Sequence, residues 1–286
     1  MDLQELYGRL ALPPEIAAQL ERIGAALDLG SLDGCLEGML HRETAKQAHG
    51  QLKAALGEDP ECIKMLYCQL ECARRAWDRY RERGIPESIY WDTMGCFPRF
   101  LAECRRKTGR IFFDRDRWTW RQTGMALFRI GALEYELLDR GGTVEVHIPS
   151  DADFSREAVD SSLARADGFF RRFYPEYPYD AYTCHSWLLS PALPPLLPDR
   201  SHIRSFQERF TILGVDGADR EFMEWLFQAP AEAAWEELPA RTRLQRAVRE
   251  LLRGGGTVGS AYGRMERRSV SGGSDAEKRT ERSEGC

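Results

Sequence analysis

An alternating segment near the middle of the chain carries two residue types suited to proton transfer. In the run T-V-E-V-H-I-P at 143–149, Glu145 and His147 share one face of a predicted strand, and apolar side chains occupy the other face. An imidazole has an unperturbed pKa of about 6.5, so His147 can accept a proton near neutral pH, and Glu145 is a second candidate base. The alternative is that both side chains only hydrogen-bond or contact solvent on the sheet face.

A second strand-like run, A-Y-T-C-H-S-W-L-L-S-P at 181–191, contains a thiol, an imidazole and hydroxyl groups close together. Adjacent strand residues point to opposite faces, so His185 cannot readily activate Cys184 or Ser186 as a nucleophile. The run therefore carries no locally activated nucleophile.

The intervening sequence predicts the elements that position these residues. The apolar run at 128–138 ends in Asp139–Gly142, a polar connection typical of a hairpin into the strand at 143–149. Ser155 is a suitable N-cap for an amphipathic helix that ends before Pro175. Beyond the run at 181–191, the pattern predicts a strand at 210–215 and helices at 201–209, 219–227 and 241–252.

Composition limits the class of protein. With 286 residues and 43% apolar content, the chain can bury a sizeable core in one large domain or two smaller ones. A net charge of −5 and a pI near 5.7 disfavour a general nucleic-acid binder. No apolar run is long enough to span a membrane and the start lacks a secretory signal, so we expect a cytoplasmic protein. The eight cysteines form no C-x-x-C pair, which favours free thiols and no metal site.

Helical periodicity dominates the first 107 residues, and Pro98 predicts a kink or two short helices there. Aromatic and β-branched residues at 111–113 and 118–120 predict the first strands. After Gly254 the sequence becomes polar and glycine-rich. We therefore predict an α+β protein with a helical N-terminal domain at 1–107, a mixed β-sheet flanked by helices at 108–253 and a flexible or disordered tail at 254–286.

Several motifs together resemble a known family. They are L-F-R-I-G-A-L-E-Y-E-L, V-E-V-H-I-P-S, C-H-S-W-L-L-S-P, L-L-P-D-R-S-H-I-R-S-F-Q-E-R-F and T-R-L-Q-R-A-V, spread over most of the chain. The set is similar to a group of bacterial acyltransferase-domain proteins, in which a helical domain precedes a domain with the GNAT acyltransferase fold. The resemblance implies that acetyl-CoA or another acyl-CoA is the donor substrate. It also implies that the thioester lies where the strand before the helix splays from its neighbour, and that the acyl group, expected to be acetyl, passes to an amine.

The turn that would hold the coenzyme departs from the GNAT pattern. GNAT enzymes normally use a glycine-rich turn whose N–H groups bind the pyrophosphate. Here the turn is P-S-D-A-D-F-S at 149–155, without glycine and with Asp151 and Asp153. A carboxylate about 4 Å from a phosphate charge opposes binding by about 4 kcal/mol at an effective dielectric of 20, unless one aspartate instead caps the helix. By resemblance, the residues expected to contact acyl-CoA are Ile148, Ser150, Ala152, Ser155 and Arg156.

Direct acyl transfer needs a base for the acceptor amine and an acid for the departing thiolate, but no nucleophilic side chain. The resemblance assigns the base to His147 or Glu145 and the acid to Ser186 or Tyr182, because GNAT enzymes often use a hydroxyl at that end of the site. The expected acceptor is a small-molecule or peptide amine, with no nucleic-acid or membrane partner. The alternative is a catalytically degenerate GNAT fold that serves as a binding or regulatory module, which the acidic turn favours.

Overall fold

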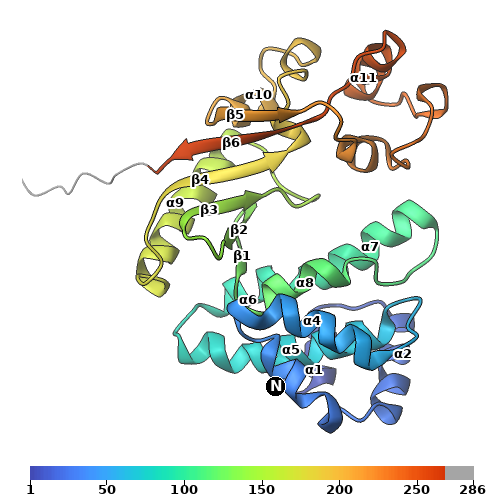
Figure 1. The fold of residues 1–286 in the computed structure, drawn as a ribbon, viewed down its shortest axis with the longest axis vertical. Helices are drawn as coiled ribbons and strands as arrows, with labels where there is room; N and C mark the ends of the chain where they lie inside the picture. Colours follow the sequence, from blue (N-terminus) through green and yellow to red (C-terminus); the bar gives the residue numbers. More distant parts are fainter. Residues whose placement is uncertain (268–286) are drawn as a thin grey trace, which may run out of the picture.

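The computed structural model describes residues 1–267. Helices form the N-terminal part, and one six-stranded sheet with further helices forms the rest (Figure 1). This arrangement is the predicted α+β class. The helices are α1 (Leu3–Arg9), α2 (Pro14–Ala26), α3 (Asp33–Gly38), α4 (Arg42–Leu56), α5 (Ile63–Glu82), α6 (Glu87–Met94), α7 (Cys96–Thr108), α8 (Asp116–Thr123), α9 (Arg156–Phe173), α10 (His202–Gln207) and α11 (Arg243–Arg253). The strands are β1 (Leu127–Ile130), β2 (Leu133–Leu137), β3 (Gly142–His147), β4 (Tyr179–Ser186), β5 (Thr211–Asp216) and β6 (Ser260–Glu266).

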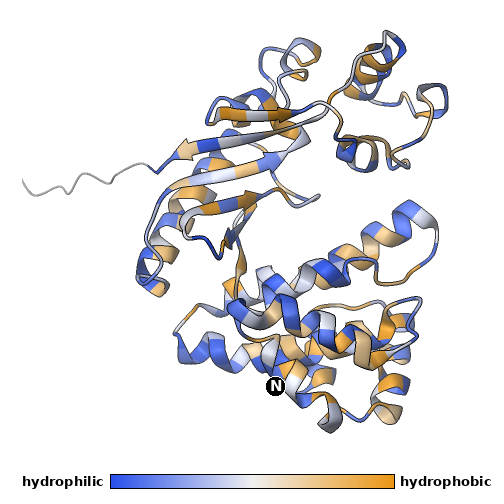
Figure 2. Cartoon of the chain, in the orientation of Figure 1, coloured by the Kyte–Doolittle hydropathy of each residue, from blue (hydrophilic) through white to orange (hydrophobic). Residues whose placement is uncertain are grey.

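The long helix α5 is the centre of the N-terminal part. Its apolar residues at helical spacing, among them Leu66, Leu70 and Ala73, are fully buried by the surrounding helices. Figure 2 shows the corresponding alternation of apolar and polar residues along these helices. The chain breaks between α6 and α7 at Gly95 rather than at Pro98, because Pro98 lies in the first turn of α7, where no intrahelical N–H bond is lost.

The strands predicted at 111–113 and 118–120 are absent from the described chain, so that prediction was wrong. Residues Asp116–Thr123 instead form α8, which packs on α4 and α5. The buried Asp116 carboxylate accepts hydrogen bonds from His49 at 3.1 Å and Lys53 at 2.9 Å. These tertiary contacts override the β propensity of the local aromatic residues. Helical structure therefore continues beyond residue 107, to Thr123.

The sheet has the strand order β1-β2-β3-β4-β6-β5. All neighbouring strands are antiparallel except β3 and β4, which are parallel and joined by α9. The run at 128–138, predicted as one strand, forms both β1 and β2. They are separated at Gly131, whose φ of 70° is the left-handed conformation that glycine adopts without strain. The predicted hairpin at 139–142 is confirmed, since it joins β2 to β3.

Strand β6 lies inside the sheet, between β4 and β5. The prediction of a flexible tail beginning at residue 254 was therefore wrong for Ser260–Glu266. Hydrogen-bonded partners on both sides order this segment, and the local sequence does not reveal them. The last part of the predicted tail, 268–286, lies outside the described residues.

The two faces of the sheet have different neighbours. On one face, the Tyr135 hydroxyl lies 2.8 Å from Ser162 of α9. On the other face, Glu134 of β2 accepts a hydrogen bond from Arg99 of α7 at 2.6 Å. The predicted chemistry of Glu145 and His147 belongs to this second face, because their register partners are Glu136 and Glu134. Among residues 1–267, no helix is both long and apolar enough to cross a membrane.

Candidate active site

Strands β3 and β4 pair over only part of their length. Their parallel register ends where Glu145 lies opposite Thr183. Beyond this point, β3 stays paired with β2 as far as His147, and β4 stays paired with β6 as far as Ser186. The two strands therefore part at their C-terminal ends, and their facing N–H and C=O groups lose sheet partners across the gap. This is the predicted splay before α9.

A cavity of about 210 Å³ lies at this opening. Its walls come from the ends of β3 and β4, from α7 and α8, and from the segment around the π-helical turn η4 (Met223–Phe227). Apolar lining residues include Phe100, Trp118, Val146, Ile148, Trp187 and Trp225. Polar lining residues include Glu103, Glu134, His147, His185 and Ser186. A largely apolar wall with a few convergent polar groups is typical of a small-molecule site.

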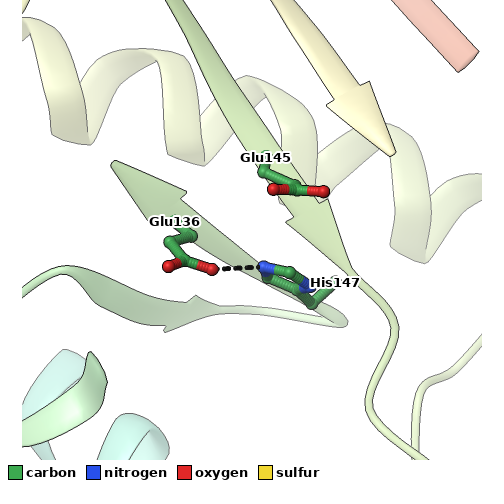
Figure 3. A group of neighbouring side chains, drawn as sticks. All are labelled: Glu136, Glu145 and His147. Atoms are coloured by element: carbon green, nitrogen blue, oxygen red, sulfur yellow. Dashed lines mark hydrogen bonds and ion pairs between the residues drawn. The ribbon is translucent and has the colours of Figure 1, made fainter. Parts of the chain in front are cut away.

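His147 lines the cavity in a fixed orientation. Its Nε2 atom lies 2.8 Å from Oε2 of Glu136 on the adjacent strand (Figure 3). The Trp118 ring packs edge-on against the imidazole, with a centroid distance of 4.9 Å. Burial acts to raise the pKa of Glu136, but the hydrogen bond and charge of His147, together with Arg121, outweigh burial and lower it. Glu136 therefore stays ionised, orients the imidazole and can stabilise an imidazolium.

Helix α7 forms the wall opposite the sheet. Arg99 is nearly buried, pairs with Glu134 at 2.6 Å and lies 3.6 Å from the Glu103 carboxylate. Glu103 also accepts a hydrogen bond from the Ser150 hydroxyl, while its Oε2 atom has no partner within the described chain. Burial raises the pKa of Glu103. These contacts tie α7 to β2 and to the turn that follows β3.

Protein groups engage both aspartates in that turn. Arg129 donates to the two oxygens of Asp151 at 2.8 and 3.0 Å, and Arg99 lies 3.4 Å away. Asp153 accepts a hydrogen bond from the Ser155 N–H at 2.8 Å. Ser155 is the N-cap of α9, as predicted. The negative charge of Asp151 is therefore offset by arginine, and Asp153 stabilises the start of the helix.

The other residues predicted to contact acyl-CoA surround the same turn. Ile148 and Ser150 line the cavity. The Ala152 N–H donates to the Pro149 carbonyl, which closes the turn without glycine. Arg156 lies in the first turn of α9, where its Nε is 3.8 Å from the Asp160 carboxylate. Its side chain is 68% exposed, so the guanidinium is also accessible to a ligand.

The two predicted proton donors lie in different environments. Tyr182 is on the α9 face, where its hydroxyl lies 3.1 Å from that of Tyr179, and burial raises its pKa to about 12. The structure therefore does not bring Tyr182 to the cavity. Ser186 does line the cavity, and its Oγ accepts from the Leu188 N–H at 3.1 Å. A hydroxyl that accepts in this way keeps its own proton available. The neighbouring Cys184 thiol is buried, which raises its pKa and disfavours a thiolate nucleophile.

Glu145 lies beside the pair formed by His147 and Glu136 (Figure 3). One ligand atom from each of the three residues lies within 4.8 Å of the others, which is close enough for a divalent cation. However, His147 and Arg121 already engage the two oxygens of Glu136, at 2.8 and 3.0 Å. Within the described residues, the arrangement is therefore a hydrogen-bonded histidine–carboxylate pair with a second carboxylate beside it.

Sequence reasoning missed the contribution of α7 to the site. Arg99 and Glu103 follow Pro98 in a segment whose pattern predicts only an amphipathic helix. The i, i+4 spacing of this Arg–Glu pair is typical of a solvated ion pair and does not indicate a cavity wall. Trp118, which the sequence predicted to lie in a strand, is instead on helix α8, where its ring packs against the imidazole.

Solved structures with the same fold are acyltransferases. One, an acyltransferase in complex with decanoyl-CoA and teicoplanin, matches with a TM-score of 0.76 and 23% identity over 92% of this chain and 87% of that chain. Another, an acyltransferase in complex with decanoyl-CoA, matches with a TM-score of 0.73 and 27% identity over 93% of this chain and 87% of that chain. A search of curated protein sequences found no match.

The fold and the splayed strands define a GNAT-like protein with an N-terminal helical domain. Residues 1–125 match the model of the N-acyltransferase N-terminal domain, and residues 127–265 match that of the GNAT-like C-terminal domain. The chain therefore belongs to the family that joins these two domains.

Proposed function

We propose that this protein is an acyltransferase that moves an acyl group from acyl-CoA directly to an amine. The observation that carries the proposal is the parting of β3 and β4 beside the His147–Glu136 pair. The opening provides unpaired backbone groups for the pantetheine amides, and the histidine provides a base at its edge. A binding module would have no need of an oriented imidazole.

The proposed reaction needs no covalent enzyme intermediate. His147 accepts a proton from the acceptor ammonium, directly or through water, and the amine nitrogen then attacks the thioester carbon. A backbone N–H at the parted strands stabilises the developing oxyanion. The C–S bond breaks, Ser186 donates its proton to the departing thiolate, and the nitrogen, now bonded to the acyl carbon, returns its remaining surplus proton to Ser186 through water. The products are the amide, the CoA thiol and the protonated His147. The Glu136 carboxylate positions His147 and stabilises its protonated form.

The coenzyme end of the proposed site lies at the turn 149–155. Arg129 and Arg99 offset Asp151, so the missing glycine motif does not leave a bare carboxylate against a phosphate. The exposed guanidinium of Arg156 supplies a positive charge at the start of α9. Together these contacts support acyl-CoA binding by an unusual turn.

The proposed acyl group is longer than acetyl. Phe100, Trp118 and Trp225 give the cavity a broad apolar wall, and related structures contain decanoyl-CoA or octanoyl-CoA. The sequence-based prediction is an acetyl group, and the assay below compares the two chain lengths. The proposed acceptor is a small-molecule or peptide amine that enters between the sheet and α7. A related acyltransferase structure contains teicoplanin.

The experiment is a mass-spectrometric transfer assay with acyl-CoAs from two to twelve carbons and a panel of amines. We expect acyl-amine and free CoA to form in equal amounts, with a preference for medium-length chains. Thermal shift with the same acyl-CoAs separates binding from turnover, because a bound ligand raises the melting temperature. Binding without transfer in any combination would support the degenerate module, and an acetyl preference would restore the earlier prediction.

A further inference from the structure

A second cavity lies between the helical domain and the end of α9. Its charged and hydroxyl-bearing lining residues include Arg42 and Glu43 at the start of α4, Arg79 and Arg83 at the end of α5, and Tyr174 and Glu176 after α9. It shares no lining residue with the first cavity. Its volume is about 100 Å³.

The charged groups of this cavity favour an anion. Three guanidinium groups face two carboxylates, which leaves a positive balance. Glu43 pairs with Arg42, and Glu176 pairs with Arg83, but both carboxylates are more than half exposed. Such exposed ion pairs contribute little to stability, so either glutamate can turn towards solvent when an anion of higher charge enters the cavity.

The backbone adds further donors. The start of α4 has no side-chain cap, and the first N–H groups of any helix have no intrahelical partners. A 15-residue helix also presents the positive end of its dipole here. Arg79 is held in place by hydrogen bonds to the Leu40 carbonyl and to His41.

Independent support comes from Tyr174. This residue is 6% exposed, and its hydroxyl has no hydrogen-bond partner within residues 1–267. The Arg83 guanidinium lies over its ring at 4.2 Å. Burial raises the pKa of Tyr174, so the hydroxyl stays protonated and can donate. The Nε–H of Arg42 is likewise buried without a partner in this part of the chain. Buried donors without acceptors are costly, and an anion would satisfy them.

We infer that this cavity is a binding site for a phosphate-sized dianion, held by Arg42, Arg83 and the Tyr174 hydroxyl. The shared chemistry is a phosphoryl group, supplied either by orthophosphate or by a small phosphomonoester. The arginines come from the helical domain and Tyr174 from the acyltransferase domain, so the bound anion bridges the two domains. This inference does not depend on the proposed acyl transfer.

The test is isothermal titration calorimetry of the full chain with inorganic phosphate and with glycerol 3-phosphate, with the ionic strength matched by chloride. Thermal unfolding is followed in parallel. We expect saturable binding and a higher melting temperature than in chloride for the wild type. The Arg42→Gln and Arg83→Gln variants should bind phosphate at least about tenfold more weakly, because each loses one charge-assisted contact. Preference for one titrant identifies the source of the phosphoryl group.

Two further variants keep the test decisive. Tyr174→Phe removes the unpartnered hydroxyl while preserving the ring, so it should fold normally and still bind phosphate more weakly. Arg22→Gln, an exposed arginine on α2, should bind like the wild type. Phosphate stabilises many proteins non-specifically, so only the difference between variants counts. Equal responses in all variants, or no binding beyond chloride in the wild type, would overturn the inference.

Discussion

The Nε2 atom of His147 on β3 lies 2.8 Å from a carboxylate oxygen of Glu136 on β2. The two residues are diagonal neighbours across the strand pair, since Glu136 lies opposite Glu145 and Glu134 lies opposite His147. The sheet register therefore brings an imidazole and a carboxylate together at the point where β3 leaves β4.

Replacing either member of this pair should slow transfer without preventing acyl-CoA binding. We expect His147→Gln to lower kcat by roughly 10²–10⁴-fold, the usual contribution of general base catalysis. Glu136→Gln should lower kcat less and alter the pH profile, because the imidazolium loses its counter-ion. Steady-state kinetics and acyl-CoA titration measure both effects. Unchanged kcat in His147→Gln would assign the proton transfer to another group.

The acidic turn should bind acyl-CoA more weakly when the Asp151 carboxylate loses its arginine partner. Arg129→Gln removes the two hydrogen bonds that hold the carboxylate, so we expect the Kd for acyl-CoA to rise roughly 5–50-fold through repulsion of the phosphates. The double variant Arg129→Gln/Asp151→Asn removes the repelling charge and should recover most of the affinity. If the double variant binds as weakly as the single one, Arg129 acts by a route other than shielding Asp151.

The sequence predicted the elements around the site but not its full wall. Local signals were sufficient for the hairpin at 139–142, for the Ser155 cap and for the strand that carries His147. Each depends on turn chemistry or on an alternating pattern that the chain shows over a few residues.

The structural features that the sequence did not predict all depend on contacts between residues far apart in the chain. The segment at 118–120 became helical because α8 packs on α4 and α5. Strand β6 is ordered by β4 and β5, not by its own glycine-rich sequence. Likewise, Glu103 contacts Ser150 across 47 residues, so no local pattern reveals that α7 closes the cavity.

Asp116 should make the helical domain sensitive to acid. The pKa of this buried carboxyl is lowered to about 2, because the hydrogen bonds and charges of His49 and Lys53 outweigh the opposing effect of burial. In the unfolded chain the pKa of this carboxyl is near 3.9, so its lowered pKa in the folded state stabilises the fold at pH values above about 4. This contribution of about 2 kcal/mol is lost as the pH falls from about 4 towards 2.

Asp116→Asn should lower the free energy of unfolding by at least about 2 kcal/mol at pH 7 and weaken its decrease below pH 4. Urea denaturation over this pH range measures both effects. Asp78→Asn, at an exposed position on α5, is the control and should leave the curve unchanged. If the free energy of unfolding fell equally steeply below pH 4 in the wild type and in Asp116→Asn, this assignment would be contradicted.

Glu103 should have the opposite effect on stability. Burial raises its pKa, so its ionisation destabilises the folded state increasingly as pH rises above the unfolded value near 4.3. Glu103→Gln removes the charge and still accepts from Ser150, so we expect a higher melting temperature at pH 8 and little change at pH 4. Glu82→Gln, an exposed residue at the end of α5, is the matched control. A lower melting temperature at pH 8 would show that the ion pair with Arg99 dominates.

The proposed acyl transfer requires the pantetheine arm of acyl-CoA to enter the gap between β3 and β4. Residue-resolved hydrogen–deuterium exchange, with and without decanoyl-CoA, measures this directly at the amides of 146–148 and 184–187. We predict that decanoyl-CoA slows exchange in both segments, because the N–H groups that face the gap acquire acceptors or become shielded from water. Unchanged exchange at both segments under saturating decanoyl-CoA would contradict the claim.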